Sequence, residues 1–241
     1  MIKKLLRQVV QRFGYRYFKI AYQPVGLDHA HDVARFLGSA TNVKVVFDVG
    51  ANEGQTTEHY LRTFPCAQIY SIEPFTTAYQ SLAKRLSRLP RVKTFQLAFA
   101  DSDRSARIKL AALSVQNSLR YEVGDGCSRL DSELIEIRTL DSFCAEQNIN
   151  HIDLLKTDTE GFDLEVLKGA EGMIRARQIQ FILTEATFHR DDSYHTSFFS
   201  LAEYLHAFGY CFVDLYDHDF VSCNPTRPPL AYCNALFTAC K

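Results

Sequence analysis

The chain has 241 residues, a formal net charge of −1 at neutral pH, 46% hydrophobic residues and 23% charged residues. This composition is that of an ordinary globular protein and excludes a disordered or low-complexity chain. A net charge near zero gives the whole molecule no general attraction to nucleic acid, and no apolar run reaches the roughly 18 residues that cross a bilayer. The length fits one large domain with a short extension.

The first 20 residues differ from the rest because they hold six basic residues and no acidic one. Apolar residues recur there at helical spacing, opposite a largely basic face, and predict an amphipathic helix. Two interpretations stay open: the helix packs on the body or a partner subunit, or it lies on an anionic membrane surface. We therefore expect a basic arm at residues 1–40 and a domain at residues 41–241, with peripheral membrane contact through residues 1–20 and homo-oligomerisation both open.

Seven cysteines are scattered along the chain without a CxxC or CxxH spacing. This pattern is not typical of a zinc cluster or a disulfide framework, and it favours reduced cysteines in a cytoplasmic protein. The basic N-terminus lacks the continuous apolar stretch of a secretory signal, which agrees with a cytoplasmic location.

From residue 43 onward, predicted strands and helices alternate. In chain order we expect a strand at 43–49, a helix at 55–64, strands at 67–73 and 92–100 around a helix at 76–88, strands at 107–113 and 133–140, a strand at 152–157, a helix at 163–174, a strand at 179–185, a helix at 197–208, and strands at 211–216 and 231–239. This alternation is typical of an α/β fold with a mainly parallel sheet and helices on both faces. The last two strands, joined by a loop, predict an antiparallel C-terminal edge.

The first predicted strand runs into a glycine-containing turn, where Asp48 stands just before Gly50. Ligands of open α/β sheets bind at the carboxyl ends of strands, and a glycine there lets the backbone approach them. A dinucleotide site would read GxGxxG, whereas this turn reads GxxxG. A carboxylate at the turn favours a cationic ligand such as S-adenosylmethionine, and a plain strand–helix turn is the alternative. The candidate cofactor-binding residues of this turn are Asp48, Gly50, Ala51, Asn52 and Gly54.

Acidic residues also lie at the carboxyl ends of the next two predicted strands. Glu73, followed by Pro74, ends the second strand, where a carboxylate can accept hydrogen bonds from ribose hydroxyls. Asp101 follows the third strand, from which a carboxylate can reach the adenine amino group. The alternatives are a surface glutamate before a helix and a turn aspartate. Acids at the ends of three consecutive strands together favour an S-adenosylmethionine site.

Three stretches resemble the FkbM-type methyltransferases: FDVGANEG at 47–54, IEP at 72–74 and LKTDTEGFDLEVLKGA at 155–170. Asp163 stands where that pattern usually has Glu. The resemblance covers about residues 43–240 and leaves out the basic arm. It implies a Rossmann-like, class I methyltransferase fold with a seven-stranded sheet. It also implies methyl transfer from S-adenosylmethionine to a hydroxyl oxygen of a sugar, glycan or related natural product, without identifying the acceptor.

Methyl transfer needs an aligned acceptor oxygen and a group that removes the hydroxyl proton. The predicted strand at 152–157 leads into Asp158, our first candidate for the base or acceptor-orienting group, and Glu160, our second. A purely structural alternative is that Glu160 caps the next helix and Asp158 pairs with Lys156. The candidate catalytic residues are Lys156, Asp158, Glu160, Glu185 and His189.

His189 lies in a loop, 187–197, that we expect to line the acceptor cleft together with Asp191, Asp192, Tyr194 and His195. A solvated loop histidine is the alternative for His189. Asp158, Glu160, Glu185 and His189 can also bind a divalent ion, but no compact ligand spacing demands it, so we do not predict a metal site.

The irregular segment 113–130 is long for a connection in a compact domain and resembles a lid or substrate loop. Asn117 and Ser118 in this segment can hydrogen-bond a hydroxylated acceptor.

Three other functions compete with an O-methyltransferase. A nicotinamide-dependent oxidoreductase lacks support because neither GxGxxG nor a Tyr-xxx-Lys pair is present. A non-catalytic scaffold with a methyltransferase fold is disfavoured by the acids at positions 48, 73 and 158. Methylation of nucleic acid is disfavoured because the body is acidic and no basic aromatic groove is visible. We expect a hydroxylated small molecule or glycan as the partner and no nucleic acid.

Overall fold

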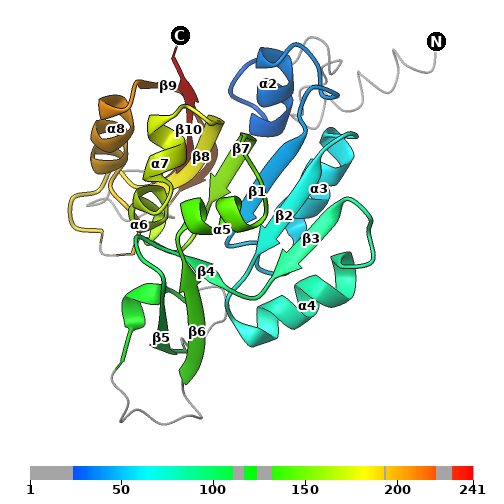
Figure 1. The fold of residues 1–241 in the computed structure, drawn as a ribbon. Helices are drawn as coiled ribbons and strands as arrows, with labels where there is room; N and C mark the ends of the chain where they lie inside the picture. The colour runs from blue at the N-terminus through cyan, green and yellow to red at the C-terminus, as the bar shows by residue number, and fades with distance from the viewer. Residues whose placement is uncertain (1–23, 111–116, 124–131, 193, 221–229, 241) are drawn as a thin grey trace, which may run out of the picture.

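The structure is a computed structural model that describes residues 24–110, 117–123, 132–192, 194–220 and 230–240 (Figure 1). The predicted N-terminal helix lies outside the described residues. So do residues 111–116 and 124–131, which include much of the irregular segment.

Seven strands form the central sheet, in the order β3-β2-β1-β7-β8-β10-β9. β1, β2, β3, β7 and β8 pair in parallel, whereas β10 is antiparallel to both of its neighbours. The predicted seven-stranded, mainly parallel sheet with an antiparallel C-terminal edge is therefore confirmed. The strands are β1 Val45–Val49, β2 Gln68–Ile72, β3 Val92–Phe95, β7 Ile152–Thr157, β8 Ile179–Ala186, β9 Tyr210–Phe220 and β10 Leu230–Ala239.

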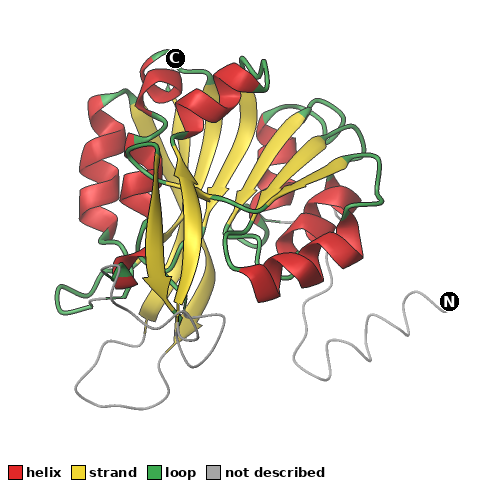
Figure 2. Cartoon of the chain, turned by 60° about the horizontal axis from the view of Figure 1, so that its bottom comes forward, coloured by secondary structure: helices red, strands yellow, loops and turns green. Residues whose placement is uncertain are grey.

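Helices cover both faces of this sheet, as predicted (Figure 2). Apolar residues of α2 (His29–Phe36) and α3 (Gln55–Thr63) share one buried cluster with one side of the strands. α4 (Thr76–Leu86) packs beside α3 through Leu82 and Leu86. The other side of the sheet is buried by α5 Leu140–Glu146, α6 Asp163–Lys168, α7 Glu171–Arg175 and α8 Phe198–Ala207.

Three further strands form a separate small sheet in the order β4-β6-β5: β4 Ala98–Phe99, β5 Arg104–Lys109 and β6 Ser132–Arg138. The prediction of one strand at 92–100 is therefore wrong. The chain leaves the main sheet after Phe95 and enters the small sheet at Ala98. The apolar run is continuous because both of its halves are buried, although in different sheets.

Two other details of the helices differ from the prediction. The helix expected at 163–174 is broken at Gly169, whose Cα lies so close to the carbonyl of Ala100 that a Cβ would clash. The helices α2 and α5 were not predicted. α2 lies in the range assigned to the arm, yet Ala30 and Val33 are fully buried in the core. The domain boundary at residue 40 stays a prediction.

The prediction that the cysteines are reduced is wrong for one pair. Cys211 on β9 and Cys240 after β10 form a disulfide with a Cα–Cα distance of 5.9 Å. The antiparallel pairing of β9 with β10 brings these two cysteines together, which sequence spacing could not indicate. Among the described residues, Cys66, Cys144 and Cys233 are free thiols, and no described helix is long and apolar enough to cross a membrane.

Candidate cofactor and acceptor site

A pocket of about 140 Å³ lies at the carboxyl ends of β1, β2 and β7. This is the edge of an open parallel sheet where ligands bind. Its walls come from the turn after β1, the start of α4, the small sheet, the segment before Tyr121 and the residues after β7. The lining residues are Val49, Gly50, Asn52, Ile72, Glu73, Pro74, Phe75, Ala78, Ala98, Phe99, Asn117, Ser118, Leu119, Asp158, Thr159 and Glu160.

The turn after β1 needs the glycine at its start. Gly50 has φ 76°, and the carbonyl oxygen of Asp158 lies where a Cβ would be. The amides of Gly50 and Ala51 both donate to the carbonyl of Ile72, at 3.0 Å each. The turn is thereby held against β2 and against the end of β7, and it forms one side of the pocket.

Asp48 lies beneath this turn rather than in the pocket. Its side chain is fully buried, accepts a hydrogen bond from the Thr57 hydroxyl at 2.6 Å, and lies 3.2 Å from Lys156 Nζ. Asp48 does not line the pocket. The sequence predicted Asp48 at the edge of the sheet where ligands bind. Its carboxylate instead bonds to Thr57 of α3 and pairs with Lys156.

Glu73 does lie in the pocket wall. Its two carboxylate oxygens accept hydrogen bonds from the backbone amides of Asn52 and Phe75, at 3.0 Å each. Burial raises the pKa of Glu73 to about 7, although these amides favour the charged form. Each oxygen retains a second lone pair for a ligand hydroxyl, so Glu73, Asn52 and Pro74 remain candidates for holding the cofactor.

Asp101, expected from the sequence to reach the adenine amino group, does not line the pocket. Its side chain is about half exposed and lies 3.6 Å from Arg104 at the start of β5. Because the chain has already joined the small sheet at Ala98, Asp101 extends beyond the edge that forms the pocket. Ala98 and Phe99 line the pocket instead.

Lys156 is almost completely buried between two carboxylates. Its Nζ lies 3.2 Å from Asp48 and 3.1 Å from Asp158. Burial opposes its charge, but the two carboxylates together raise the pKa of Lys156 above its usual value. Lys156 therefore fixes the position of Asp158, whose side chain is 37% exposed at the pocket. Asp158 therefore pairs with Lys156 and also lines the pocket.

Glu160 follows in a tight turn, with φ 52° at Glu160 and 86° at Gly161. The Ser118 hydroxyl donates to the Glu160 carbonyl at 2.8 Å, and Arg120 Nε donates to the Gly161 carbonyl at 2.9 Å. Burial and the charge of Asp158 raise the pKa of the Glu160 carboxyl to about 7. The segment that holds Asn117 and Ser118 is thus tied to the end of β7, and both residues line the pocket.

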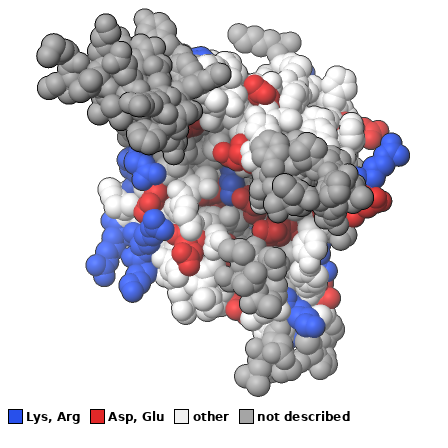
Figure 3. Space-filling view, turned by 180° about the vertical axis from the view of Figure 1, so that it is seen from behind, with Lys and Arg blue, Asp and Glu red and all other residues white. Residues whose placement is uncertain are grey.

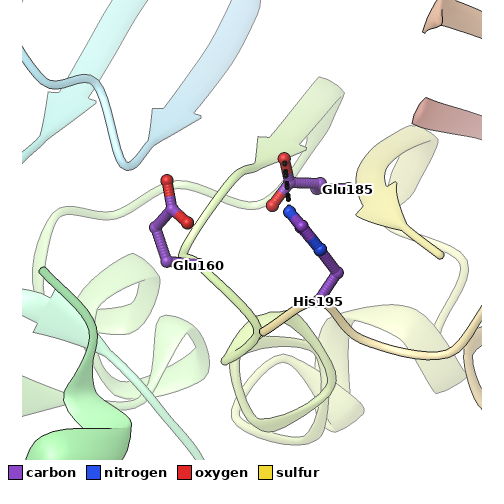
Figure 4. A group of neighbouring side chains, drawn as sticks. All are labelled: Glu160, Glu185 and His195. Atoms are coloured by element: carbon purple, nitrogen blue, oxygen red, sulfur yellow. Dashed lines mark ion pairs between the residues drawn. The ribbon is translucent and has the colours of Figure 1, made fainter. Parts of the chain in front are cut away.

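Glu185, the penultimate residue of β8, is brought close to Glu160 and to His195 (Figure 4). Its Oε1 lies 3.9 Å from His195 Nε2, and burial raises the pKa of Glu185 to about 10, with added repulsion from Asp158. The sequence named His189 as one further candidate catalytic residue of this loop. The histidine that lies beside Glu185 is His195, because the chain returns to β8 where Thr187 N donates to the Thr196 carbonyl.

Carboxyl groups are crowded together on this side of the pocket. Asp163, at the first position of α6, is fully buried, and burial raises its pKa to about 6. On the face seen from behind, acidic side chains gather near the middle, and most visible basic side chains lie towards the edges (Figure 3). Such a site favours a cationic ligand over a phosphate.

Comparison with known proteins supports the resemblance. A family model described as the methyltransferase FkbM domain matches residues 48–212. The 2-O-methyltransferase NoeI of Sinorhizobium fredii is 27% identical over 155 residues, which are 58% of this chain and 62% of NoeI. The methyltransferase sdnD of Sordaria araneosa is 26% identical over 182 residues, covering 62% of this chain and 68% of that protein.

Solved structures with a similar shape include an rRNA methylase from Streptococcus thermophilus, with a TM-score of 0.48 and 11% identity, covering 88% of this chain and 96% of that chain. TrmK of M. capricolum, solved with S-adenosylhomocysteine, gives a TM-score of 0.47 and 10% identity, covering 87% of this chain and 67% of that chain. The family model spans more than half of the chain and agrees with the observed sheet. The chain therefore belongs to the FkbM family of S-adenosylmethionine-dependent methyltransferases and has the predicted class I fold.

Proposed function

We propose that this protein transfers the methyl group of S-adenosylmethionine to a hydroxyl group of a sugar, a glycan or a related polyol. The observation that carries the proposal is the acidic pocket at the ends of β1, β2 and β7, where Glu73 and Asp158 face the same space. S-adenosylmethionine carries two cationic groups and a ribose, which match a carboxylate-lined pocket with free acceptor lone pairs.

The residues on the β2 side of the pocket suit the cofactor. Glu73 offers its unused lone pairs to ribose hydroxyls, and Phe75 and Ala78 provide an apolar wall. Gly50 and Asn52 contribute the turn after β1 to this side of the wall. When bound, S-adenosylmethionine supplies an electrophilic methyl group.

Asp158 is the residue proposed to receive the acceptor's hydroxyl proton or to orient that hydroxyl. Lys156 holds its carboxylate at the pocket with Nζ at 3.1 Å, so the group needs little reorganisation when the hydroxyl arrives. Glu160 and Glu185 extend the same acidic edge towards β8. Hydroxyls of a polyol are natural donors to such carboxylates, and this favours a sugar over an apolar acceptor.

Two further facts bear on the acceptor. NoeI is named a 2-O-methyltransferase. Methyl transfer to an oxygen atom is proposed for the present protein by similarity to NoeI alone. The acidic edge is unsuited to a nucleic acid phosphate backbone, so we retain the expectation of no nucleic-acid partner. A cytoplasmic location, with or without membrane contact of the arm, remains part of the proposal.

The test is transfer of a labelled methyl group from S-adenosylmethionine to a panel of mono- and oligosaccharides. We expect a product whose label survives alkaline treatment, as an ether does and an ester does not. Asp158→Asn should lower turnover about 10²–10⁴-fold while changing cofactor affinity only a few-fold. Glu171→Gln, an exposed residue paired with Arg175, is the control and should keep full activity.

Calorimetry on the same preparation addresses the two alternative functions. A nicotinamide-dependent enzyme would bind a nicotinamide cofactor in preference to S-adenosylmethionine. A scaffold would bind S-adenosylmethionine without turnover on any acceptor. Either result would overturn the proposed reaction.

A further inference from the structure

We propose that Glu160, Glu185 and His195 form a binding site for one divalent metal ion of the Mn²⁺ type, beside the acceptor end of the pocket. One ligand atom from each of these three side chains lies within 4.8 Å of the other two. Figure 4 shows the two carboxylates and the imidazole facing a common space. The ligands come from three separate places in the chain, namely the turn after β7, the end of β8 and the loop before α8.

The strongest sign of a missing ligand is Glu185. Its side chain is about nine-tenths buried, yet Oε2 has no hydrogen-bond partner within the described part of the chain. Oε1 lies 3.9 Å from His195 Nε2, which is too long for a hydrogen bond. A buried carboxylate without partners is costly unless something cationic binds it. Lys156 does not serve this role because it is committed to Asp48 and Asp158.

His195 is oriented as a metal ligand would be. Its Nδ1 lies 2.8 Å from Asp192 Oδ2, so Nδ1 carries the proton and the lone pair of Nε2 is directed towards Glu185. Asp192 is itself held, because its Oδ1 accepts from the backbone amides of Tyr194 and His195. The ring also stacks on Tyr232, with centroids 4.4 Å apart. A carboxylate behind a histidine is the usual outer support of a metal-bound imidazole.

The spacing and the chemistry of the ligands define the ion. Bond lengths of about 2.0–2.2 Å bring ligand atoms to about 3–3.5 Å from one another. The cluster must therefore contract slightly, and the partly exposed Glu160 can provide that shift. Two carboxylates with one imidazole suit a first-row divalent ion such as Mn²⁺ better than Mg²⁺ or Ca²⁺, which prefer oxygen ligands alone.

Three protein ligands leave coordination positions open. Glu160 lines the pocket, so these positions face the side on which the acceptor is expected. Adjacent hydroxyls of a polyol can occupy them, and the metal would then orient the acceptor beside Asp158. This last step rests on the proposed function, whereas the metal site itself does not.

The test is titration of the full-length protein with Mn²⁺. Binding is measured as the loss of the electron paramagnetic resonance signal of the free ion. We expect one ion per chain. Glu185→Gln and His195→Gln should raise the Kd at least about 100-fold, and Asp192→Asn, which is not a ligand but supports His195, about 10–100-fold. His151→Gln changes an exposed histidine that pairs with the buried Asp153, Glu171→Gln changes an exposed glutamate, and neither should alter the Kd.

Near-UV circular dichroism without metal checks that each variant is folded, and the mild Asp192→Asn change keeps the test informative if another variant unfolds. Absence of saturable Mn²⁺ binding by the wild type, or binding that is indifferent to the Glu185 and His195 variants, would overturn the site. Methyl transfer is measured separately. A failure to bind Mn²⁺ would therefore not contradict the proposed reaction. An absence of methyl transfer would not affect the measurement of Mn²⁺ binding.

Discussion

Glu73 combines burial, two backbone hydrogen bonds and a position in the pocket wall. The amides of Asn52 and Phe75 hold its carboxylate in place, so the residue is preorganised before any ligand binds. Because both amides belong to segments that also line the pocket, a change at Glu73 affects the ligand contact and the shape of the wall together.

Replacing Glu73 by Gln should weaken S-adenosylmethionine binding about 10–100-fold, because a hydrogen bond to a charged group contributes about 1.5–3 kcal/mol. Calorimetric titration measures this change. Glu53→Gln is the matched control, since Glu53 is exposed in the same turn and does not line the pocket. Equal affinity of the wild type and Glu73→Gln would exclude Glu73 from the cofactor site.

The stability of the ligand-free protein should also depend on pH through Glu73. Its folded pKa of about 7 exceeds the ordinary value of 4.5, so the folded state binds more protons than the unfolded state between these values. The free energy of unfolding therefore falls as pH rises from about 4.5 to about 7, by at most about 3 kcal/mol from this residue. Urea unfolding at pH 5 and pH 8 should show a smaller fall in Glu73→Gln than in the wild type, and an identical fall would contradict the assignment.

At the scale of elements, the turn after β1 and the turn after β7 form the pocket together. Gly50 packs directly against the carbonyl of Asp158, and Lys156 Nζ lies 3.4 Å from the carbonyl of Gly50. Ser118 and Arg120 then connect the segment around Leu119–Tyr121 to the residues after β7. A displacement of any one of these segments is therefore passed to the others.

Gly50→Ala should disrupt this arrangement, because the new Cβ would meet the Asp158 carbonyl in addition to the strain of a positive φ. We expect a clear fall in the thermal unfolding midpoint and loss of S-adenosylmethionine binding. Gly38→Ala isolates the backbone strain, since Gly38 also has a positive φ (82°) but the nearest atom, Asn42 Nδ2, is 3.8 Å from the new Cβ. Gly38→Ala should lower the free energy of unfolding by about 1–2 kcal/mol and leave S-adenosylmethionine binding intact. Similar losses in both variants would show that the close packing at Gly50 is unimportant.

At the scale of the whole molecule, contacts between distant parts of the chain complete the core. The Tyr216 hydroxyl on β9 donates at 3.0 Å to Asp32 on α2, and this carboxylate also accepts from the amide of Gly26 at 2.8 Å. Asp32 is almost fully buried. The hydrogen bond therefore joins the first described helix to the far edge of the sheet.

Tyr216→Phe should lower the free energy of unfolding by about 1.5–3 kcal/mol, because it leaves a buried carboxylate one donor short. Urea unfolding followed by circular dichroism measures the change. Tyr79→Phe serves as the control, because Tyr79 is only partly buried and packs in another cluster. The Asp32 contact would be unimportant if the two variants lost the same stability.

Much of the central sheet could be predicted from the sequence, because each βα unit is encoded locally. The run of apolar residues, the glycine turn and the following helix are contiguous in the chain around Asp48, and the same holds around Asp158. Family membership followed from the same local motifs, since they are the parts that the pocket requires. The positions of Glu73, Asp158 and Glu160 at one edge then follow from parallel strands ending together.

What only the tertiary structure decided is how side chains meet once distant segments pack. The move of residues 98–99 into a second sheet takes Asp101 away from the pocket. The return of the loop to Thr187 brings His195, which sequence spacing did not single out, to Glu185. The periodicity of apolar residues in the sequence indicates only whether a residue is buried. Which partner buries it depends on strand pairing and loop closure, and these are set by contacts between residues far apart in the chain.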